Sequence, residues 1–210
     1  MRQVEAEVGI LPRRLSGRAV GVLCRAFAED PILTYFLGRG ARRDLAYRMF
    51  FADVVRSSLA LGHVHAATSD NHLFGVAVWK PPGVSVMSLR SRMKSALRAL
   101  VVRALYPRAA RELFAGFANL EANHPSVPHW YLMFVGIDPG FQGQGQGAKL
   151  LAPVLELADA SGTLCYLETP FRQTHAFYQR LGFQITSESH PFRGAPPLWT
   201  MLRQPGRGSA

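Results

Sequence analysis

Apolar side chains recur along the chain with two different periods, which predicts a mixture of helices and strands. Between residues 16 and 28, Val20, Leu23, Cys24 and Phe27 fall on one face at the three-to-four spacing of an amphipathic helix. Short apolar runs bounded by Gly, Pro, Asn or Asp have the character of strands instead. In the first part of the chain the pattern predicts helices at 16–28 and 41–60, and strands at 1–11, 63–68 and 73–80.

The rest of the chain continues this alternation. Predicted helices lie at 84–105, 107–123, 147–160 and 172–181, and predicted strands at 130–137, 163–169, 183–186 and 198–202. The sequence contains no internal repeat, and no shift of composition marks a linker. It therefore predicts one mixed α/β domain over residues 1–203, followed by a polar C-terminal tail at 204–210.

Length and composition are those of an ordinary globular chain. The 210 residues are 48% hydrophobic and 18% charged, and a chain of this length can form a core without cross-links. Two cysteines are too few for a disulfide scaffold or a multi-cysteine zinc module. No apolar run reaches about 18 residues and the first residues lack the pattern of a signal peptide. We therefore expect a cytoplasmic protein with no membrane span.

The formal net charge of +10 is unusual, and it is unevenly placed. Residues 80–111 hold eight basic and no acidic side chains, whereas residues 112–203 hold five basic and seven acidic ones. A basic chain can bind nucleic acid, an anionic membrane surface or an acidic small molecule. No recognition motif accompanies the arginines, which disfavours nucleic acid. We interpret the basic segment as a solvated helix face, with binding of an anionic ligand as the alternative.

A glycine-rich segment, Gln142-Gly143-Gln144-Gly145-Gln146-Gly147, lies between an apolar strand and an amphipathic helix. Backbone N–H groups at the start of a helix can converge on an anion such as a pyrophosphate. The spacing differs from the dinucleotide fingerprint, and it is not a P-loop because no Ser or Thr follows Lys149. Taken alone, the segment is either an anion-binding loop or a flexible connection.

The surroundings of this loop carry a family resemblance. The run from His129 to Pro139, followed by Gln142-x-x-Gly145-x-Gly147, resembles the acetyl-CoA-binding motif of the GNAT superfamily of N-acetyltransferases. Downstream, the stretches 166–169 (Tyr-Leu-Glu-Thr) and 177–183 (Phe-Tyr-Gln-Arg-Leu-Gly-Phe) resemble the family's next motif. The combination looks most like the puromycin N-acetyltransferase-like branch. The resemblance covers residues 129–183.

The resemblance implies a single GNAT-like domain with a central, mostly antiparallel, twisted sheet that is splayed at the cofactor strand and flanked by helices. It also implies acetyl-CoA as the acyl donor, without a metal. The residues expected to bind acetyl-CoA are Val135, Gly136 and Ile137 at the pantetheine arm, Gln142, Gly143, Gln144, Gly145, Gln146, Gly147 and Ala148 at the pyrophosphate, and Thr174 and Phe177 on the helix that follows. Thr174 stands where relatives often carry Asn, so it can keep one hydrogen bond but not two.

The resemblance also puts Tyr178 at the position of the family's general acid. An amine attacks the acetyl carbonyl and the thiolate of CoA leaves, so the sulfur needs a proton. The ordinary pKa of tyrosine, ~10, lies above that of a thiol, ~8.5, so direct transfer costs roughly 2 kcal/mol. We interpret Tyr178 as a relay whose proton transfer is coupled to loss of the amine proton, with a core aromatic as the alternative.

The general base has several candidates. A lysine-type amine with pKa ~10.4 is neutral in roughly one molecule in 2,500 at pH 7, so such an acceptor nearly requires a base. The side chains near the motifs that could serve are Glu121, His124, His129 and Glu168, and a water chain is an equal candidate. His63 and His65 share a strand face without a neighbouring cysteine or carboxylate, so we expect no metal site there.

The sequence thus predicts an acetyl-CoA-dependent N-acetyltransferase that acts directly on the primary amine of a small molecule. An enzyme that acts on a protein or peptide amine is the second hypothesis, and a non-catalytic acyl-CoA-binding sensor is the third. Tyr178 favours an enzyme, because a pure binder needs no proton relay. No motif identifies the amine, and a homodimer stays open.

Overall fold

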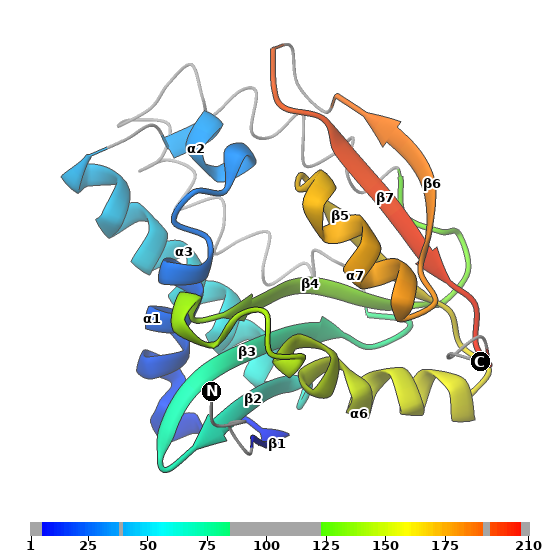
Figure 1. Ribbon diagram of the computed structural model, residues 1–210, viewed down its shortest axis with the longest axis horizontal. Helices are drawn as coiled ribbons and strands as arrows, with labels where there is room; N and C mark the ends of the chain where they lie inside the picture. Colours follow the sequence, from blue (N-terminus) through cyan, green and yellow to red (C-terminus); the bar gives the residue numbers. More distant parts are fainter. Residues whose placement is uncertain (1–5, 38–39, 85–122, 191–193, 207–210) are drawn as a thin grey trace.

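The computed structural model describes residues 6–37, 40–84, 123–190 and 194–206 (Figure 1). The helices predicted at 84–105 and 107–123 therefore lie outside the described residues, as does most of the basic segment 80–111.

Seven strands form one sheet (Figure 1). They are β1 (Glu7–Ile10), β2 (Val64–Ser69), β3 (His72–Lys80), β4 (Trp130–Ile137), β5 (Cys165–Thr169), β6 (Gln184–Ser189) and β7 (Leu198–Arg203). Their order across the sheet is β1-β2-β3-β4-β5-β7-β6, and every neighbouring pair is antiparallel except the parallel pair β4 and β5. The mixed α/β fold with a mostly antiparallel sheet is confirmed.

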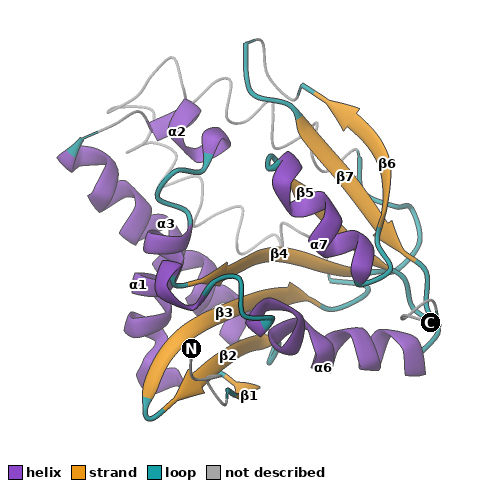
Figure 2. Ribbon diagram, viewed as in Figure 1, coloured by secondary structure: helices purple, strands orange, loops and turns teal. Residues whose placement is uncertain are grey.

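Helices cover both faces of this sheet (Figure 2). They are α1 (Ser16–Ala26), α2 (Pro31–Leu37), α3 (Ala41–Leu59), α6 (Gln146–Ala160) and α7 (His175–Arg180), with short 3-10 turns at Arg13–Leu15, Pro139–Phe141 and Arg172–Thr174. The apolar pattern predicts no helix at 32–37, yet α2 forms there. Pro31 suits the first helical position, and the Asp30 carboxylate accepts the Leu33 backbone N–H at 2.7 Å.

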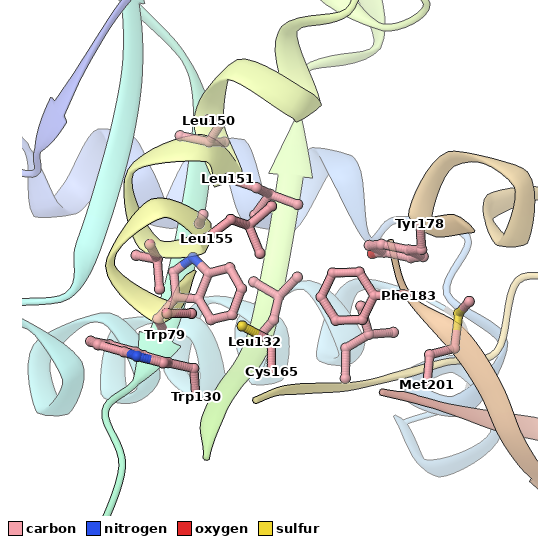
Figure 3. Packing of buried hydrophobic residues seen from close by; sticks show 14 of the residues in the cluster. Trp79, Trp130, Leu132, Leu150, Leu151, Leu155, Cys165, Tyr178, Phe183 and Met201 are labelled. Atoms are coloured by element: carbon pink, nitrogen blue, oxygen red, sulfur yellow. The ribbon is translucent and has the colours of Figure 1, made fainter. Parts of the chain in front are cut away.

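Alternate residues of the strands supply two hydrophobic cores, one on each face of the sheet. On one face, Trp79, Leu132 and Cys165 pack with α6 and α7 (Figure 3). On the other face, Val76 and Val78 pack with α1 and α3. The strand β4 lies between the two cores, so its backbone position is fixed from both sides.

Two single features complete the description of the fold. Cys165 is completely buried in the core beneath α6, as its apolar neighbours indicate. Within the part of the chain that the structure describes, no helix is long and apolar enough to cross a membrane.

Candidate active site

The strands β4 and β5 part from each other halfway along the sheet. Their parallel pairing comprises three residue pairs and ends at Leu132 opposite Leu167, although β4 continues to Ile137. A β-bulge at Met133 marks this point, because Val78 pairs with Phe134 while Trp79 pairs with Leu132. Bulges bend a strand and increase its twist. The bulge therefore turns β4 away from β5, and we call the region between the two unpaired strand halves the slot.

The predicted strand residues Val135, Gly136 and Ile137 lie in this parted half of β4. The side chains of Val135 and Ile137 pack toward the core under α6. A Cβ at Gly136 would lie 2.8 Å from the Ala26 Cβ, so this glycine is needed for the close approach of α1. The backbone edge of the three residues borders the slot on the side that β5 has left, where an extended ligand can pair with it.

The glycine loop connects the end of β4 to α6. Gly143 and Gly145 have φ of 75° and 74°, the left-handed conformation that favours glycine, and Gly145 is the N-cap of α6. A Cβ at either position would meet nothing within 4 Å, so the backbone conformation rather than crowding requires glycine here. The loop therefore places backbone amides at the N-terminus of a 15-residue helix, where such groups can bind an anion.

Side-chain amides hold the loop in this shape. Gln142 Nε2 donates to the Ile137 carbonyl at 2.9 Å, and Gln144 Nε2 donates to the Gly140 carbonyl at 3.4 Å. Two of the three predicted glutamines thus hydrogen-bond to the backbone of β4 and of the loop. Gln146, at the first position of α6, is buried, and Ala148 lies in the first turn.

An ion pair fixes the start of the loop. The buried Asp138 carboxylate accepts two hydrogen bonds from the Arg25 guanidinium at 2.6 and 2.8 Å, and its backbone N–H donates to the Phe74 carbonyl at 2.7 Å. The sequence indicates no role for Arg25, because the two partners are 113 residues apart. The pair ties the loop to both α1 and β3, which suits a site whose backbone geometry must be preorganised.

The third glycine of the loop has a packing role. A Cβ at Gly147 would lie 3.1 Å from the Phe177 ring, so the missing side chain lets α7 lie against the start of α6. The ring of Phe177 in turn lies 5.0 Å from that of Tyr178, centroid to centroid. The loop and the predicted acid are therefore held together through one aromatic contact.

Tyr178 lies on the face of α7 that packs against the sheet. It is 7% exposed, and its hydroxyl end points toward β4 (Figure 3). Burial raises the pKa of its hydroxyl above the ordinary value. The higher pKa makes the phenol a weaker acid, which widens its gap from a thiol and fits a coupled relay better than a free proton donor.

The Thr174 hydroxyl is already hydrogen-bonded within the connection from β5 to α7. Its hydroxyl donates to the Phe171 carbonyl at 2.7 Å and lies 3.0 Å from the Thr169 Oγ1. Because a hydroxyl has one proton to donate, Thr174 can offer a ligand only an acceptor in this arrangement. Thr174 can therefore form the expected hydrogen bond to acetyl-CoA only as an acceptor.

Three of the four candidate bases lie in the described residues, and they form one cluster. The Glu168 carboxylate accepts the hydroxyls of Tyr131 and Tyr166, each at 2.9 Å. The rings of His124 and His129 share a hydrogen bond of 3.0 Å, and the His124 ring packs on both tyrosines with centroids 4.5 Å away. Glu121 lies outside the described residues.

Burial shifts the titration of this cluster. It raises the pKa of Glu168, against the effect of the two tyrosine hydrogen bonds. It lowers the pKa of His124 to about 4, helped by His129 and Lys80. His124 is therefore neutral at physiological pH and a weak base, whereas the Glu168 carboxylate is a stronger base than an exposed one.

A second buried carboxylate belongs to the connection between α1 and α2. Asp30 is 4% exposed, and burial raises its pKa to about 6. A cavity of about 530 Å³ lies beside it, lined by Glu29, Pro31, Thr34, Tyr35, Gly194, Ala195 and Pro196. The sequence shows Asp30-Pro31 only as the end of a helix, because burial of a capping carboxylate leaves no pattern in the chain.

His63 and His65 lie just before and within β2. His65 is buried in β2, and the His63 ring meets the edge of Trp130 at 4.7 Å. Among the residues that the structure describes, no group of three or more His, Cys, Asp or Glu could hold a metal ion.

The described geometry combines a parted pair of parallel strands, an amide-lined loop at a helix N-terminus and a buried tyrosine on the next helix. Fold and site together define the class of GNAT-like acyltransferases. The sequence model of the acetyltransferase (GNAT) family matches residues 40–183. The chain belongs to this family.

Known proteins that are similar to this chain include other acetyltransferases. An uncharacterised N-acetyltransferase of Schizosaccharomyces pombe is 25% identical over 199 residues, which are 90% of this chain and 79% of the relative. Two solved structures share the fold with a TM-score of 0.68. The histone acetyltransferase HPA2 and related acetyltransferase of Corynebacterium glutamicum is 21% identical, over 98% of this chain and 99% of its own. The polyamine N-acetyltransferase of Drosophila melanogaster is 14% identical, over 95% of this chain and 100% of its own.

Proposed function

We propose that this acetyltransferase moves the acetyl group of acetyl-CoA directly to the primary amine of a small molecule. The observation that carries the proposal is the slot between β4 and β5, with the glycine loop at one end and Tyr178 beside it. The family generally uses acetyl-CoA. A direct transfer needs both substrates in one place, and we expect the acceptor to enter from the face opposite Tyr178.

The loop and the slot fit the two polar parts of acetyl-CoA. The N–H groups from Gln142 to Ala148 would bind the pyrophosphate, and the edge of Val135–Ile137 would pair with the pantetheine arm beside Phe177. Residues 112–203 hold five basic and seven acidic side chains, so backbone amides rather than side-chain charge must supply most of the pyrophosphate recognition. The open space in front of Gly143 and Gly145 leaves room for the phosphates.

The amine and the thiolate then need opposite proton transfers. Attack requires an uncharged amine, and the departing sulfur requires a proton. Tyr178 would pass this proton on, taking one from the nitrogen as the carbon–sulfur bond breaks. Because burial raises the pKa of Tyr178, donation without that coupling would cost more than the roughly 2 kcal/mol of an unshifted phenol.

The size of the acceptor is the least constrained part of the proposal. The Drosophila relative in fold is described as catalysing the formation of N-acetylagmatine, which supports a small amine. The same site could serve a protein or peptide amine. The likeness of the sequence motifs to the puromycin N-acetyltransferase-like branch stays a prediction. A cytoplasmic location also stays a prediction.

Thiol release from acetyl-CoA tests the function directly. The panel comprises agmatine, spermidine, 2-phenylethylamine and a short peptide with a free N-terminus, and calorimetry measures acetyl-CoA binding in parallel. We expect binding of acetyl-CoA and turnover with at least one of the three small amines. Turnover with the peptide alone would transfer the function to protein amines. Binding without turnover would indicate a sensor, and no binding would refute the proposal.

A further inference from the structure

Glu168 is placed where the slot begins. The last pair between β4 and β5 joins Leu132 to Leu167, so Glu168 is the first residue of β5 beyond the paired region. Its two carboxylate oxygens accept hydrogen bonds from both sides of the opening, Oε2 from Tyr131 on β4 and Oε1 from Tyr166 on β5. The carboxylate thus bridges the two strands at the point where they part.

The carboxylate and Tyr178 lie on opposite faces of the sheet. Leu167 packs in the same core as Tyr178, on the side of α6 and α7. Successive strand residues point to opposite faces, so Glu168 points to the side of α1 and α3, together with Tyr131 and Tyr166. A thioester lying in the slot would therefore have the tyrosine on one face and the carboxylate on the other.

Within the described residues, the Glu168 carboxylate has hydrogen-bonding capacity left. A carboxylate offers about four acceptor sites, and the two tyrosine hydroxyls take two of them. The tyrosines fix its orientation, and Glu168 is half-buried rather than fully enclosed. An ammonium group carries three donors, which suits the free sites of an oriented carboxylate.

The other buried groups fit this task less well. The His124 ring already shares a hydrogen bond with His129, and at a pKa of about 4 it holds a proton weakly. The Asp30 carboxylate accepts the Leu33 backbone N–H at the start of α2, so it serves as a helix cap. The Glu168 carboxylate, in contrast, accepts hydrogen bonds from two tyrosine side chains and lies at the slot itself.

The geometry points to Glu168 as the general base that takes the proton from the acceptor ammonium at the mouth of the slot. This inference rests on the proposed function. The Glu168 carboxylate accepts one proton from nitrogen, and the nitrogen lone pair then forms a bond to the acetyl carbon. The carbon–sulfur bond breaks with its electron pair on sulfur, which gains the second amine proton through Tyr178. Glu168 finally releases its proton to solvent, so the products are the acetamide, CoA thiol and one proton.

The described groups around Glu168 come from several elements. They are Tyr131 of β4, Tyr166 of β5, the rings of His124 and His129, Lys80 of β3, which pairs with Tyr131, and Thr200 of β7, which pairs with Glu168. Lys80 is the charged one and acts on His124. Tyr131 and Tyr166 are the groups that touch the carboxylate, so their removal should alter its titration first.

The test compares Glu168→Gln with the wild-type enzyme on two amines of one shape. The best acceptor from the panel is paired with its analogue that carries two fluorines on the carbon next to the aminomethyl group, because fluorine lowers the amine pKa. With the ordinary amine we expect kcat/KM to fall about 100-fold or more, and with the fluorinated amine no more than about threefold. In the variant, kcat/KM should rise tenfold per pH unit toward the amine pKa.

Three further variants serve as controls for the assignment of Glu168 as the base. Glu156→Gln replaces an exposed carboxylate of α6 and should change neither rate. Tyr131→Phe removes one donor to Glu168, which should raise the carboxylate pKa and move the acidic limb of kcat/KM to higher pH. Asp30→Asn keeps a helix cap and should lose activity equally on both amines, if it loses any. Calorimetric binding of acetyl-CoA verifies that each variant is folded.

The outcomes separate the inference from the function beneath it. A wild-type enzyme that acetylates no amine refutes the proposed function, and the base with it. Turnover by the wild type combined with equal losses of Glu168→Gln on both amines, or an unchanged pH profile, overturns the base alone. The base assignment would also be overturned if Asp30→Asn, rather than Glu168→Gln, lost kcat/KM on the ordinary amine but kept it on the fluorinated amine. If Glu168→Gln fails to fold, an unshifted acidic limb in Tyr131→Phe refutes the assignment.

Discussion

Replacing Tyr178 by Phe removes one oxygen from the sheet-facing side of α7 and leaves the ring in place. The ring is 7% exposed and packs against Phe177 and Phe183 at centroid distances of 5.0 and 5.9 Å. These contacts survive the substitution. The described residues give the Tyr178 hydroxyl no hydrogen-bond partner, so the variant loses no recorded bond.

The expected result is an enzyme that is folded but slow. Because the described residues offer this hydroxyl no hydrogen bond, the free energy of unfolding should change by less than about 1 kcal/mol. The loss of a proton relay should lower kcat by at least tenfold, or about 1.4 kcal/mol of transition-state stabilisation. The Kd of acetyl-CoA should stay nearly unchanged, because we propose that the cofactor is bound by the loop amides and the β4 edge rather than by the Tyr178 hydroxyl.

Tyr47→Phe is the matched control. Tyr47 is also buried, but its hydroxyl accepts a hydrogen bond from the Arg43 guanidinium at 2.9 Å, on α3. This control should lose about 1–3 kcal/mol of stability and keep its kcat. Urea unfolding, calorimetry and thiol release measure the three quantities for both variants. Full retained turnover in Tyr178→Phe would remove Tyr178 from the mechanism, and a large loss of stability would show a structural hydroxyl instead.

Three other predictions follow from single contacts. Gly136→Ala puts a Cβ 2.8 Å from the Ala26 Cβ and should cost about 1–3 kcal/mol in urea unfolding; an unchanged midpoint would mean that α1 can move freely. Gly145→Ala forces a left-handed residue at φ 74° without a steric clash, so acetyl-CoA affinity should fall while stability drops only about 1–2 kcal/mol; unchanged affinity would separate the loop from the pyrophosphate. The Arg203 guanidinium lowers the pKa of Asp159 below its ordinary 3.8, so the stability that Asp159 contributes is complete above that pH and lost as pH falls through the lower folded value. Urea unfolding of Asp159→Asn should therefore lack part of the wild-type decline below about pH 4, and a parallel decline would contradict this.

Local pattern predicted the elements that build the site. The apolar run at 130–137 coincides with β4, and the helix expected at 147–160 begins one residue earlier, as α6. These segments have a strong hydrophobic period and end at glycine or proline, so nearby residues determine their boundaries. The hairpin around Asp70 and Asn71 is equally local, because both residues adopt the positive φ that its turn requires.

The pairing of distant side chains could not be predicted in the same way. Glu168 and Tyr131 are 37 residues apart, and Arg25 and Asp138 are 113 apart. The β-bulge at Met133 arises from the fit of β4 between β3 and two helical layers, and no residue type announces it. Such features depend on the tertiary register, so a single sequence lists the candidates for a base but does not rank them.

The glycine motif shows why its sequence signal is specific even though each glycine alone is weak. Gly143 and Gly145 are required by backbone conformation, since a Cβ there would meet nothing. Gly147 is required by the Phe177 ring, and Gly136, upstream on β4, by the approach of α1. These requirements are independent of one another. Gly143 and Gly145 shape the amide loop, Gly147 lets the helix that carries Tyr178 pack closely, and Gly136 lets α1 pack on the strand whose edge borders the slot. A flexible connection has no reason to meet all of them, so their coincidence indicates a built site. Alanine at Gly147 should consequently disturb the position of Tyr178 more than the loop itself, whereas alanine at Gly145 should do the reverse.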